Sequence, residues 1–333
     1  MSASGTDHLS RSRRNQFTAV RLNREAELRD DAQWVARTLV DPHTRLVPLW
    51  RSRSLLARNS GGTVAIYLSP DQLDQPDRIQ PPTLLGNDGK REYFAVSVTD
   101  QQKETILAQL PEAQFADLRL ASIDMAAKHA GILAYAKALH YWQHRHAFCG
   151  VCGNPNLLRS AGHRMVCSNE ECARETFPRI DPAIIVLVTN KDACLLGRNA
   201  KWRSRHFSTL AGFVEPGESL EDAVIREVYE EVQLQLEDIR YVSSQPWPFP
   251  ASAMCGFYAE AVNRNAGISQ EVAETRWFTV ESLTQAVINA EVRLSPPVSI
   301  AFRLLADWFR SNGGGNLEKL VRQQAVNVPV STC

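Results

Sequence analysis

The segment GFVEPGESLEDAVIREVYEE, residues 212–231, decides the fold expected of this chain. It joins a tight Gly/Pro turn to a stretch with helical spacing of apolar residues, and a serine and an aspartate at capping-box spacing mark where the helix begins. Glu227 and Glu231 are four residues apart and share one face of that helix, with Glu230 beside them. Like charges so placed repel one another, and a hard divalent cation bound by carboxylate oxygens would relieve the repulsion. The pattern therefore favours a metal site for a phosphate substrate over a solvated acidic face, with Arg226 available to orient a carboxylate.

The residues of this segment resemble a known motif. The chain is similar to the Nudix hydrolases, whose box has the pattern G-x5-E-x7-R-E-U-x-E-E-x-G-U, where U is a bulky aliphatic residue. The last glycine of the box is replaced by Gln233, which is followed by the expected aliphatic Leu234. A glycine there permits a left-handed backbone at the helix end, so we expect that end to adapt around the glutamine. The matching positions are Gly212, Glu218, Arg226, Glu227, Glu230 and Glu231.

Length and composition set the broad class. With 333 residues the chain is long enough for about two domains. Lys and Arg together number 37, as do Asp and Glu, so no global basic field recruits nucleic acid. No apolar run approaches the length of a membrane span, and the polar N-terminus lacks the apolar core of a secretory signal. We therefore expect a soluble, cytoplasmic protein with no membrane partner.

Four of the seven cysteines lie in one window with the spacing C-x2-C-x14-C-x4-C. Two paired knuckles at this separation are typical of tetrahedral Zn²⁺ bound by four thiolates, with no open position for catalysis. The alternatives are disulfides or unrelated free thiols, and disulfides are not expected without a secretion signal. We therefore predict one structural zinc per chain, bound by Cys149, Cys152, Cys167 and Cys172.

Local patterns divide the chain into five parts. Residues 1–15 are a polar arm expected to be mobile, and residues 312–333, which begin with a run of glycines, are expected to form a flexible tail. Between them we predict an N-terminal mixed domain over 16–146, a zinc ribbon over 147–177 and a Nudix domain over 178–311. For the last, the resemblance implies an α/β (α+β) fold, the Nudix α/β/α sandwich with a mixed sheet. Predicted strands lie at 63–68, 93–98, 183–189, 193–197, 207–214, 239–244, 254–262 and 276–279, and predicted helices at 125–146, after 219, at 281–288 and at 298–310.

A second motif, SQPWPFPAS at residues 244–252, begins where a predicted strand ends. Three prolines in five residues make a stiff extended segment that cannot continue a central ladder. One interpretation is a rigid wall for a planar, amide-bearing ligand such as nicotinamide, with Trp247 and Phe249 fixed in place and Gln245 and Ser252 offering polar contacts. The other is a structural loop whose aromatic residues fill a core. Physical reasoning alone favours the second.

The resemblance reverses that order. The motif S-Q-P-W-P-F-P-x-S downstream of a Nudix box is similar to the one that separates NADH pyrophosphatases from other Nudix enzymes. The zinc ribbon and an N-terminal domain containing LLG (84–86) and YFA (93–95) belong to the same branch, so the resemblance spans roughly residues 40–310. It implies that the substrate is bound by Gln245, Pro246, Trp247, Pro248, Phe249, Pro250, Ala251 and Ser252.

The resemblance assigns further substrate contacts. Phe177 stands where a ligand-stacking tyrosine is often found, and it keeps the aromatic face without the hydroxyl. Ile185, Phe213 and Ala301 match positions that line the nucleotide pocket. Arg119 matches a substrate-contacting arginine in the N-terminal domain.

The metal ligands are also implied by the resemblance. Ala211 matches a residue whose main-chain carbonyl binds metal, and Glu271 matches a fourth metal carboxylate. Glu274 is the competing candidate, and an ordinary surface position is the alternative for both glutamates. Two or three Mg²⁺ or Mn²⁺ ions would be held by Ala211, Glu227, Glu230, Glu231 and Glu271.

The implied reaction is metal-assisted hydrolysis of the pyrophosphate bond of NADH or NAD⁺ to AMP and nicotinamide mononucleotide. Glu230 or Glu231 would orient or deprotonate the attacking water, and the sequence does not decide between them. The resemblance extends to enzymes that remove NAD caps from RNA 5′ ends and to homodimers. Two rivals remain, a general Nudix pyrophosphatase acting on ADP-ribose or other nucleoside diphosphate derivatives, and a non-enzymatic zinc-ribbon adaptor.

Overall fold

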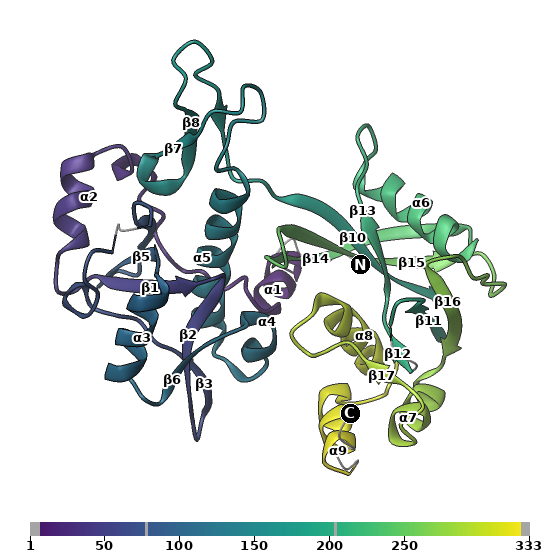
Figure 1. The fold of residues 1–333 in the computed structure, drawn as a ribbon. Coiled ribbons are helices and arrows are strands. Elements are labelled where there is room, and N and C mark those ends of the chain that lie inside the picture. The colour runs from purple at the N-terminus through teal and green to yellow at the C-terminus, as the bar shows by residue number, and fades with distance from the viewer. Residues whose placement is uncertain (1–6, 77–78, 203–204, 328–333) are drawn as a thin grey trace. The chain divides into compact units, whose positions relative to one another are not determined.

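The computed structural model describes residues 7–76, 79–202 and 205–327 of the chain (Figure 1). These residues fold into two compact units, each with its own mixed set of helices and strands. Over the same ranges, no helix combines the length and the apolar character needed to cross a bilayer.

The two units are not simple halves of the chain. The N-terminal unit combines Gln16–Ile180 with Pro246–Ser252, so a short piece of the second half folds with the first. The C-terminal unit combines Met1–Asn15, Asp181–Gln245 and Ala253–Cys333. The proline-rich segment was predicted within the Nudix domain over 178–311, whereas its last seven residues pack with the N-terminal unit.

The N-terminal unit is built on a six-stranded sheet in the order β3-β2-β1-β5-β4, with β6 paired to β2. Strands β1 and β5 are parallel and their neighbours are antiparallel, so the sheet is mixed. Successive residues of β1 point to opposite faces, with Leu46 in one buried cluster and Val47 in the other. Helix α5 covers the Val47 side through Ile132, Leu133 and Ala136. The elements are β1 (Arg45–Trp50), β2 (Arg53–Asn59), β3 (Gly62–Ala65), β4 (Thr83–Asn87), β5 (Glu92–Ser97), β6 (Ala113–Ala116), α2 (Ala32–Leu39), α3 (Asp100–Gln109), α4 (Leu118–Ala121) and α5 (Ala127–Arg145).

The zinc-ribbon region forms a small antiparallel sheet in the same unit. Its order is β7-β8-β9, and the register pairs Asn156 with Cys167. The hairpin brings the second pair of cysteines back to the first. The strands are β7 (Asn156–Arg159), β8 (Arg164–Cys167) and β9 (Glu175–Thr176).

The C-terminal unit has a sheet in the order β14-β15-β10-β11-β16, with β13 paired to β10. A separate parallel pair joins β12 to β17. In Figure 1, α6 runs along the sheet beside β13. The elements are β10 (Asp181–Asn190), β11 (Ala193–Asn199), β12 (His206–Phe207), β13 (Leu210–Phe213), β14 (Leu236–Trp247), β15 (Ser252–Ala261), β16 (Val272–Phe278), β17 (Arg293–Leu294), α6 (Leu220–Val232), α7 (Val280–Ile288), α8 (Ile300–Ser311) and α9 (Leu317–Asn327).

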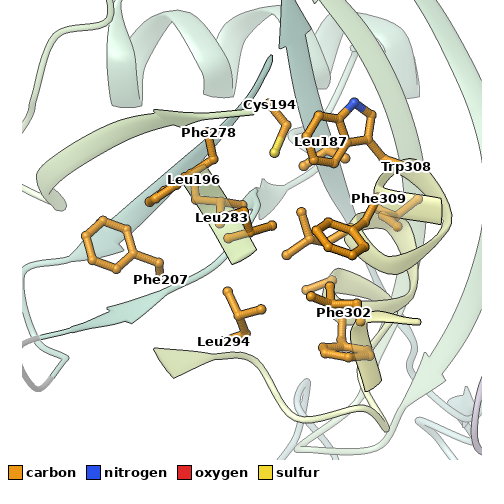
Figure 2. Close-up of a cluster of buried hydrophobic side chains, with 14 of the residues drawn as sticks. Leu187, Cys194, Leu196, Phe207, Phe278, Leu283, Leu294, Phe302, Trp308 and Phe309 are labelled. Atoms are coloured by element: carbon orange, nitrogen blue, oxygen red, sulfur yellow. The ribbon is translucent and has the colours of Figure 1, made fainter. Parts of the chain in front are cut away.

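Strand β10 explains why this sheet is covered on both faces. Ile184 and Val186 lie in the same buried cluster as the apolar residues of α6. Ile185 and Leu187 lie in the cluster formed with α7 and α8, part of which is drawn in Figure 2. Because side chains alternate along a strand, a run of uninterrupted apolar residues serves both layers. The predicted α/β/α sandwich is confirmed.

Two segments that were predicted to be mobile contain helices. The arm over 1–15 contains helix α1 (Asp7–Arg14), and Arg14 Nη2 lies 2.8 Å from Asp307 Oδ2 of α8. The tail over 312–333 contains α9, whose Leu317 is buried in the C-terminal core. Both segments are polar in sequence, and their order depends on partners elsewhere in the chain. Residues 1–6 and 328–333 of these two predictions lie outside the described residues.

The strand predicted at 239–244 is also longer than expected. Strand β14 continues to Trp247 through Pro246, which is compatible with its place at the edge of the sheet. The strand predicted over 207–214 is divided into β12 and β13.

Burial of His140 in α5 makes the stability of the protein depend on pH. The side chain is 6% exposed, and burial, assisted by His144 and Lys137, lowers its pKa to about 3. The folded-state pKa is therefore below the unfolded value of about 6.5, so stability present above pH 6.5 is lost as the pH falls. At pH 5 we expect this histidine to lower the free energy of unfolding by about 2 kcal/mol relative to neutral pH. Denaturant unfolding at pH 7.5 and pH 5 should show that the unfolding free energy of His140→Gln decreases less on acidification than that of wild type. Equal decreases would contradict the lowered pKa of His140. His43→Gln, whose side chain is 81% exposed, is the control.

Candidate active site and zinc site

Local sequence positions the acidic residues of α6. Gly217 has a positive φ of 94° in the turn that precedes the helix. Ser219 Oγ then accepts a hydrogen bond from the backbone N–H of Asp222 at 3.1 Å, and the Asp222 carboxylate accepts from Ser219 N at 3.1 Å. This reciprocal cap satisfies donors that a helix start leaves free. The helix therefore begins where the sequence predicted, and the glutamates that follow have a defined orientation.

Arg226 holds three of the carboxylates. Its Nε and Nη2 atoms donate to the two oxygens of Glu218 at 3.0 and 2.7 Å, a bidentate arrangement. Its Nη1 lies 3.0 Å from Glu227 Oε1 and 3.0 Å from Glu230 Oε2. Nη2 also donates to the Phe213 carbonyl at 2.9 Å. One guanidinium thus ties the end of β13, the turn and the helix together.

Glu231 is the most perturbed acid of the cluster. Burial raises its pKa to about 8, and the charges of Glu227 and Glu271 add to the shift. Its Oε2 atom is buried and has no hydrogen-bond partner within the described part of the chain. Burial also raises the pKa of Glu227, with Arg226 acting in the opposite direction. Half-buried carboxylates that repel one another, one of them with a buried oxygen that the described residues leave without a partner, fit a divalent cation.

Gly212 is required by the close approach of Glu227. A Cβ built on Gly212 would overlap the carboxyl group of Glu227. The first position of the Nudix box is therefore a glycine here for steric reasons.

The two candidates for the fourth acid have different surroundings. Glu271 precedes β16, and its charge raises the pKa of both Glu227 and Glu231. Glu274 instead accepts hydrogen bonds from Arg198 Nε at 3.2 Å and Arg276 Nε at 2.6 Å. Glu271 is therefore coupled electrostatically to Glu227 and Glu231, whereas Glu274 is neutralised by two arginines.

Four predicted residues of the C-terminal unit occupy different environments: the metal ligand Ala211 and the three that were assigned to the nucleotide pocket. Ala211 pairs with Ile185 in the β13–β10 register, and Ala211 is exposed while Ile185 is buried. Phe213 is 59% exposed, beside the Arg226 contacts. Ala301 is buried in the α8-side core with Ile185. Of these four residues, Ala211 and Phe213 are accessible in this unit.

The proline-rich segment is divided between the two units, with Gln245 in the C-terminal unit and Pro246–Ser252 in the N-terminal unit. The amide of Gln245 is buried, with Nε2 donating to the Val298 carbonyl at 2.8 Å and Oε1 accepting from Ile300 N at 2.8 Å, so it holds the start of α8. Trp247 and Phe249 pack against the core of the N-terminal unit. Pro248 is buried, Pro246 and Pro250 are exposed, and Ala251 and Ser252 are half-buried. The geometry matches the interpretation in which the aromatic residues fill a core.

Two further predicted contacts belong to the N-terminal unit. The guanidinium carbon of Arg119 lies 5.5 Å from the centroid of the Trp247 ring, a cation–π distance. Phe177 follows β9 and is 61% exposed, leaving its aromatic face free to stack.

The four predicted zinc ligands are brought together. Their sulfur atoms all lie within 4.8 Å of one another, with Cys149 and Cys172 3.8 Å apart and Cys152 and Cys167 3.3 Å apart. Tetrahedral Zn²⁺ with Zn–S bonds of about 2.3 Å requires similar separations. A hydrogen bond from the Asn154 backbone and another from its side chain lower the pKa of Cys152 to about 6, which favours the thiolate. Across residues 7–76, 79–202 and 205–327, this is the one group of three or more ligand atoms drawn so close.

The expectation that the helix end adapts around Gln233 was wrong. Gln233 has φ 59° and ψ 27°, the left-handed conformation that a glycine would adopt there. Its side chain lies against Gly267, where an added Cβ would be 2.6 Å from Gln233 Oε1. The Gly267 N–H also donates to the Val232 carbonyl at 2.7 Å. Contacts with this neighbouring loop hold the strained backbone in place.

Replacing Gln233 with glycine is expected to raise the unfolding free energy by up to about 1 kcal/mol, because left-handed strain is removed while backbone entropy is lost. The unfolding free energy of Gln233→Asn should lie between those of wild type and Gln233→Gly, since asparagine tolerates this conformation. Denaturant unfolding of the three proteins measures the effect. A loss of stability in Gln233→Gly would show that the contact with Gly267 outweighs the strain.

Sequence reasoning expected Arg226 to orient a carboxylate, but it did not predict that Arg226 pairs with Glu218, which was not among the predicted site residues. The signal was present, since both residues are fixed positions of the box. Their eight-residue separation spans the turn and the helix, which conceals the pairing.

Comparison with known proteins places the chain in a family. A model described as the NUDIX domain matches residues 179–296, and one described as an NADH pyrophosphatase-like rudimentary NUDIX domain matches residues 43–142. NAD-capped RNA hydrolase NUDT12 of Macaca fascicularis is 30% identical over 343 aligned residues, which cover 90% of this chain and 74% of that protein. NAD-capped RNA hydrolase NudC of Pseudomonas putida is 44% identical over 153 residues, covering 46% of this chain and 55% of that protein. The chain therefore belongs to the Nudix hydrolase family, in the branch that carries an NADH pyrophosphatase-like domain.

Proposed function

We propose that this chain hydrolyses the pyrophosphate bond of NADH or NAD⁺ to AMP and nicotinamide mononucleotide, and removes NAD caps from RNA 5′ ends by the same reaction. The observation that carries the proposal is the acidic cluster of α6, in which the Oε2 atom of Glu231 is buried and has no hydrogen-bond partner among the described residues. Its support from comparison is the alignment, over 90% of the chain, with a protein named as an NAD-capped RNA hydrolase.

Mg²⁺ or Mn²⁺ is the cofactor that the cluster fits. Glu227, Glu231 and Glu271 would hold it, with Glu230 and the Ala211 carbonyl as further oxygen donors. When bound, such an ion polarises phosphoryl oxygens and lowers the pKa of a bound water. Arg226 orients Glu227 through the 3.0 Å contact, so the carboxylate is already in position before a substrate binds.

Glu231 is the better proton acceptor of the two adjacent glutamates. Its carboxylate is shielded from solvent and its Oε2 is not engaged by the described residues. The side chain of Glu230 is 59% exposed, and its Oε2 atom forms an ion pair with Arg226 Nη1 at 3.0 Å. A general base is most effective when its pKa is near the working pH and its proton-accepting oxygen is available.

The remaining assignments concern the whole protein. The cysteine cluster supports one structural Zn²⁺ per chain, in the N-terminal unit. A homodimer is proposed from the family resemblance, and a cytoplasmic location stays a prediction from the sequence.

Side-by-side measurement of AMP release from NADH, NAD⁺, ADP-ribose and NAD-capped RNA tests the proposal. We expect kcat/KM for NADH, NAD⁺ or the capped RNA to exceed that for ADP-ribose. No AMP from any of the four substrates in Mg²⁺ or Mn²⁺ would refute the enzyme and favour the zinc-ribbon adaptor.

One observation favours a second candidate, a general Nudix pyrophosphatase. The amide of Gln245 is occupied by Val298 and Ile300, so it is not free to contact a nicotinamide. Without that contact, ADP-ribose shares every group that the acidic cluster recognises. Equal kcat/KM values for ADP-ribose and NADH would identify this activity.

A further inference from the structure

Phe17 contacts the proline-rich segment from the far end of the sequence. Its ring centroid lies 5.9 Å from that of Trp247 and 5.6 Å from that of Phe249, and both pairs are edge-to-face. Trp247 and Phe249 are themselves 5.1 Å apart in the same geometry. The three rings form one cluster within the N-terminal unit, which we call the aromatic triad (Phe17, Trp247 and Phe249).

Backbone hydrogen bonds cannot fix this segment strongly. Pro246, Pro248 and Pro250 have no N–H to donate, so alternate residues are lost to any ladder. The Phe249 N–H is used locally, donating to the Trp247 carbonyl at 2.7 Å. Strands β14 and β15 hold the two ends of the segment, and packing of the two aromatic side chains therefore contributes to holding the part between them.

The conformation of Phe17 shows that its position is strongly determined. Its side chain is 1% exposed and its φ is 73°, an outlier for a bulky residue. Such a conformation persists where the surroundings over-determine it. The neighbouring Gln16 contributes, because its Nε2 donates to the carbonyls of Ser122 and Met125 at 2.9 and 3.1 Å.

Two cations hold the other members of the aromatic triad. Arg119 lies over the Trp247 ring at 5.5 Å, and Lys137 Nζ lies 5.8 Å from the Phe249 centroid. Lys137 is fixed in turn, because it donates to the Ser52 carbonyl at 2.7 Å. The N-terminal unit thus surrounds both aromatic residues with groups of defined position.

We propose that Phe17 is a positioning residue, which fixes Trp247 and Phe249 and, through them, the selectivity of the enzyme for substrates with a nicotinamide half. The selectivity rests on the proposed function, whereas the positioning stands on the contacts alone. The N-terminal unit, which contains the rudimentary Nudix-like domain, would then contribute to selectivity, because it orders the segment Pro246–Ser252.

Phe17→Leu in the full-length protein tests both parts, with Phe94→Leu as the matched control. Phe94 is fully buried in the same unit but lies in the cluster on the other face of the sheet. Amide exchange of peptides covering 245–252, followed by mass spectrometry, reports the positioning without any substrate. The ratio of kcat/KM for NADH to that for ADP-ribose reports the selectivity.

In Phe17→Leu we expect exchange in 245–252 to quicken and the NADH to ADP-ribose ratio to fall about tenfold, the value of two aromatic pairs. Phe94→Leu should leave both unchanged. Unchanged exchange in Phe17→Leu would overturn the positioning role, and faster exchange with an unchanged ratio would overturn the link to selectivity. Wild type that does not hydrolyse NADH would refute the proposed function and leave the exchange result standing. If Phe17→Leu does not fold, Phe249→Leu tests the same contact and is expected to show both effects.

Discussion

Glu231→Gln is expected to lower kcat for NADH hydrolysis by about two to three orders of magnitude while the protein stays folded. Glutamine keeps the shape of the side chain but cannot carry the charge that a cation requires or accept a proton from water. The loss should appear in kcat more than in KM, because the substrate contacts are unaltered. Steady-state kinetics at saturating Mg²⁺ or Mn²⁺ measure it.

Glu274→Gln is the matched control for this substitution. Glu274 is paired with Arg198 and Arg276 and is not among the charges that raise the pKa of Glu227 or Glu231, so its neutralisation should leave kcat within a few-fold of wild type. Near-normal activity of Glu231→Gln, or equal losses in the two variants, would contradict the assignment of the α6 carboxylates.

In the presence of chelator, the stability of wild type and that of Glu231→Gln should depend differently on pH. The pKa of Glu231 is raised to about 8, so the buried carboxyl group opposes folding increasingly as the pH rises from its unfolded value of about 4.3 towards 8. Glutamine has no charge to bury, and the chelated variant should be at least as stable as wild type at pH 8. A lower melting temperature would indicate damage to the fold.

Cys167→Ser is expected to lose the zinc and to destabilise the N-terminal unit by several kcal/mol, because a structural zinc contributes its binding energy to folding. The buried Cys167 sulfur lies 3.3 Å from that of Cys152, in the group of four cysteine sulfurs that lie within 4.8 Å of one another. Elemental analysis should find one zinc per chain in wild type and a strongly reduced content in the variant, with a lower melting temperature.

Cys255→Ser is the control, since Cys255 is half-buried and lies outside the cysteine cluster. It should retain zinc and melt close to wild type. Wild-type protein purified with reductant and without chelator that contains no zinc would refute the site.

Short-range patterns predicted the acidic helix and the cysteine cluster well. The capping pair of Ser219 and Asp222 and the spacing of Glu227 and Glu231 act within a few turns of one helix, where geometry follows directly from residue number. Several strands of the N-terminal unit, among them β1 and β2, were not predicted. Both of their faces are buried, so the alternation that marks a half-exposed strand is missing.

The sequence by itself determined the family, the order of the box residues and the metal-binding spacing of the cysteines, because each depends on residues close together in the chain. The tertiary structure decided where polar and aromatic residues far from those motifs are used. Helix α1 is joined to α8 by the ion pair of Arg14 with Asp307. Gln245 is buried against the start of α8, and Trp247 packs beside Phe17. Each of these contacts joins residues more than 50 positions apart, and the free energy of such a contact depends on which groups the fold brings within reach. No local pattern records that.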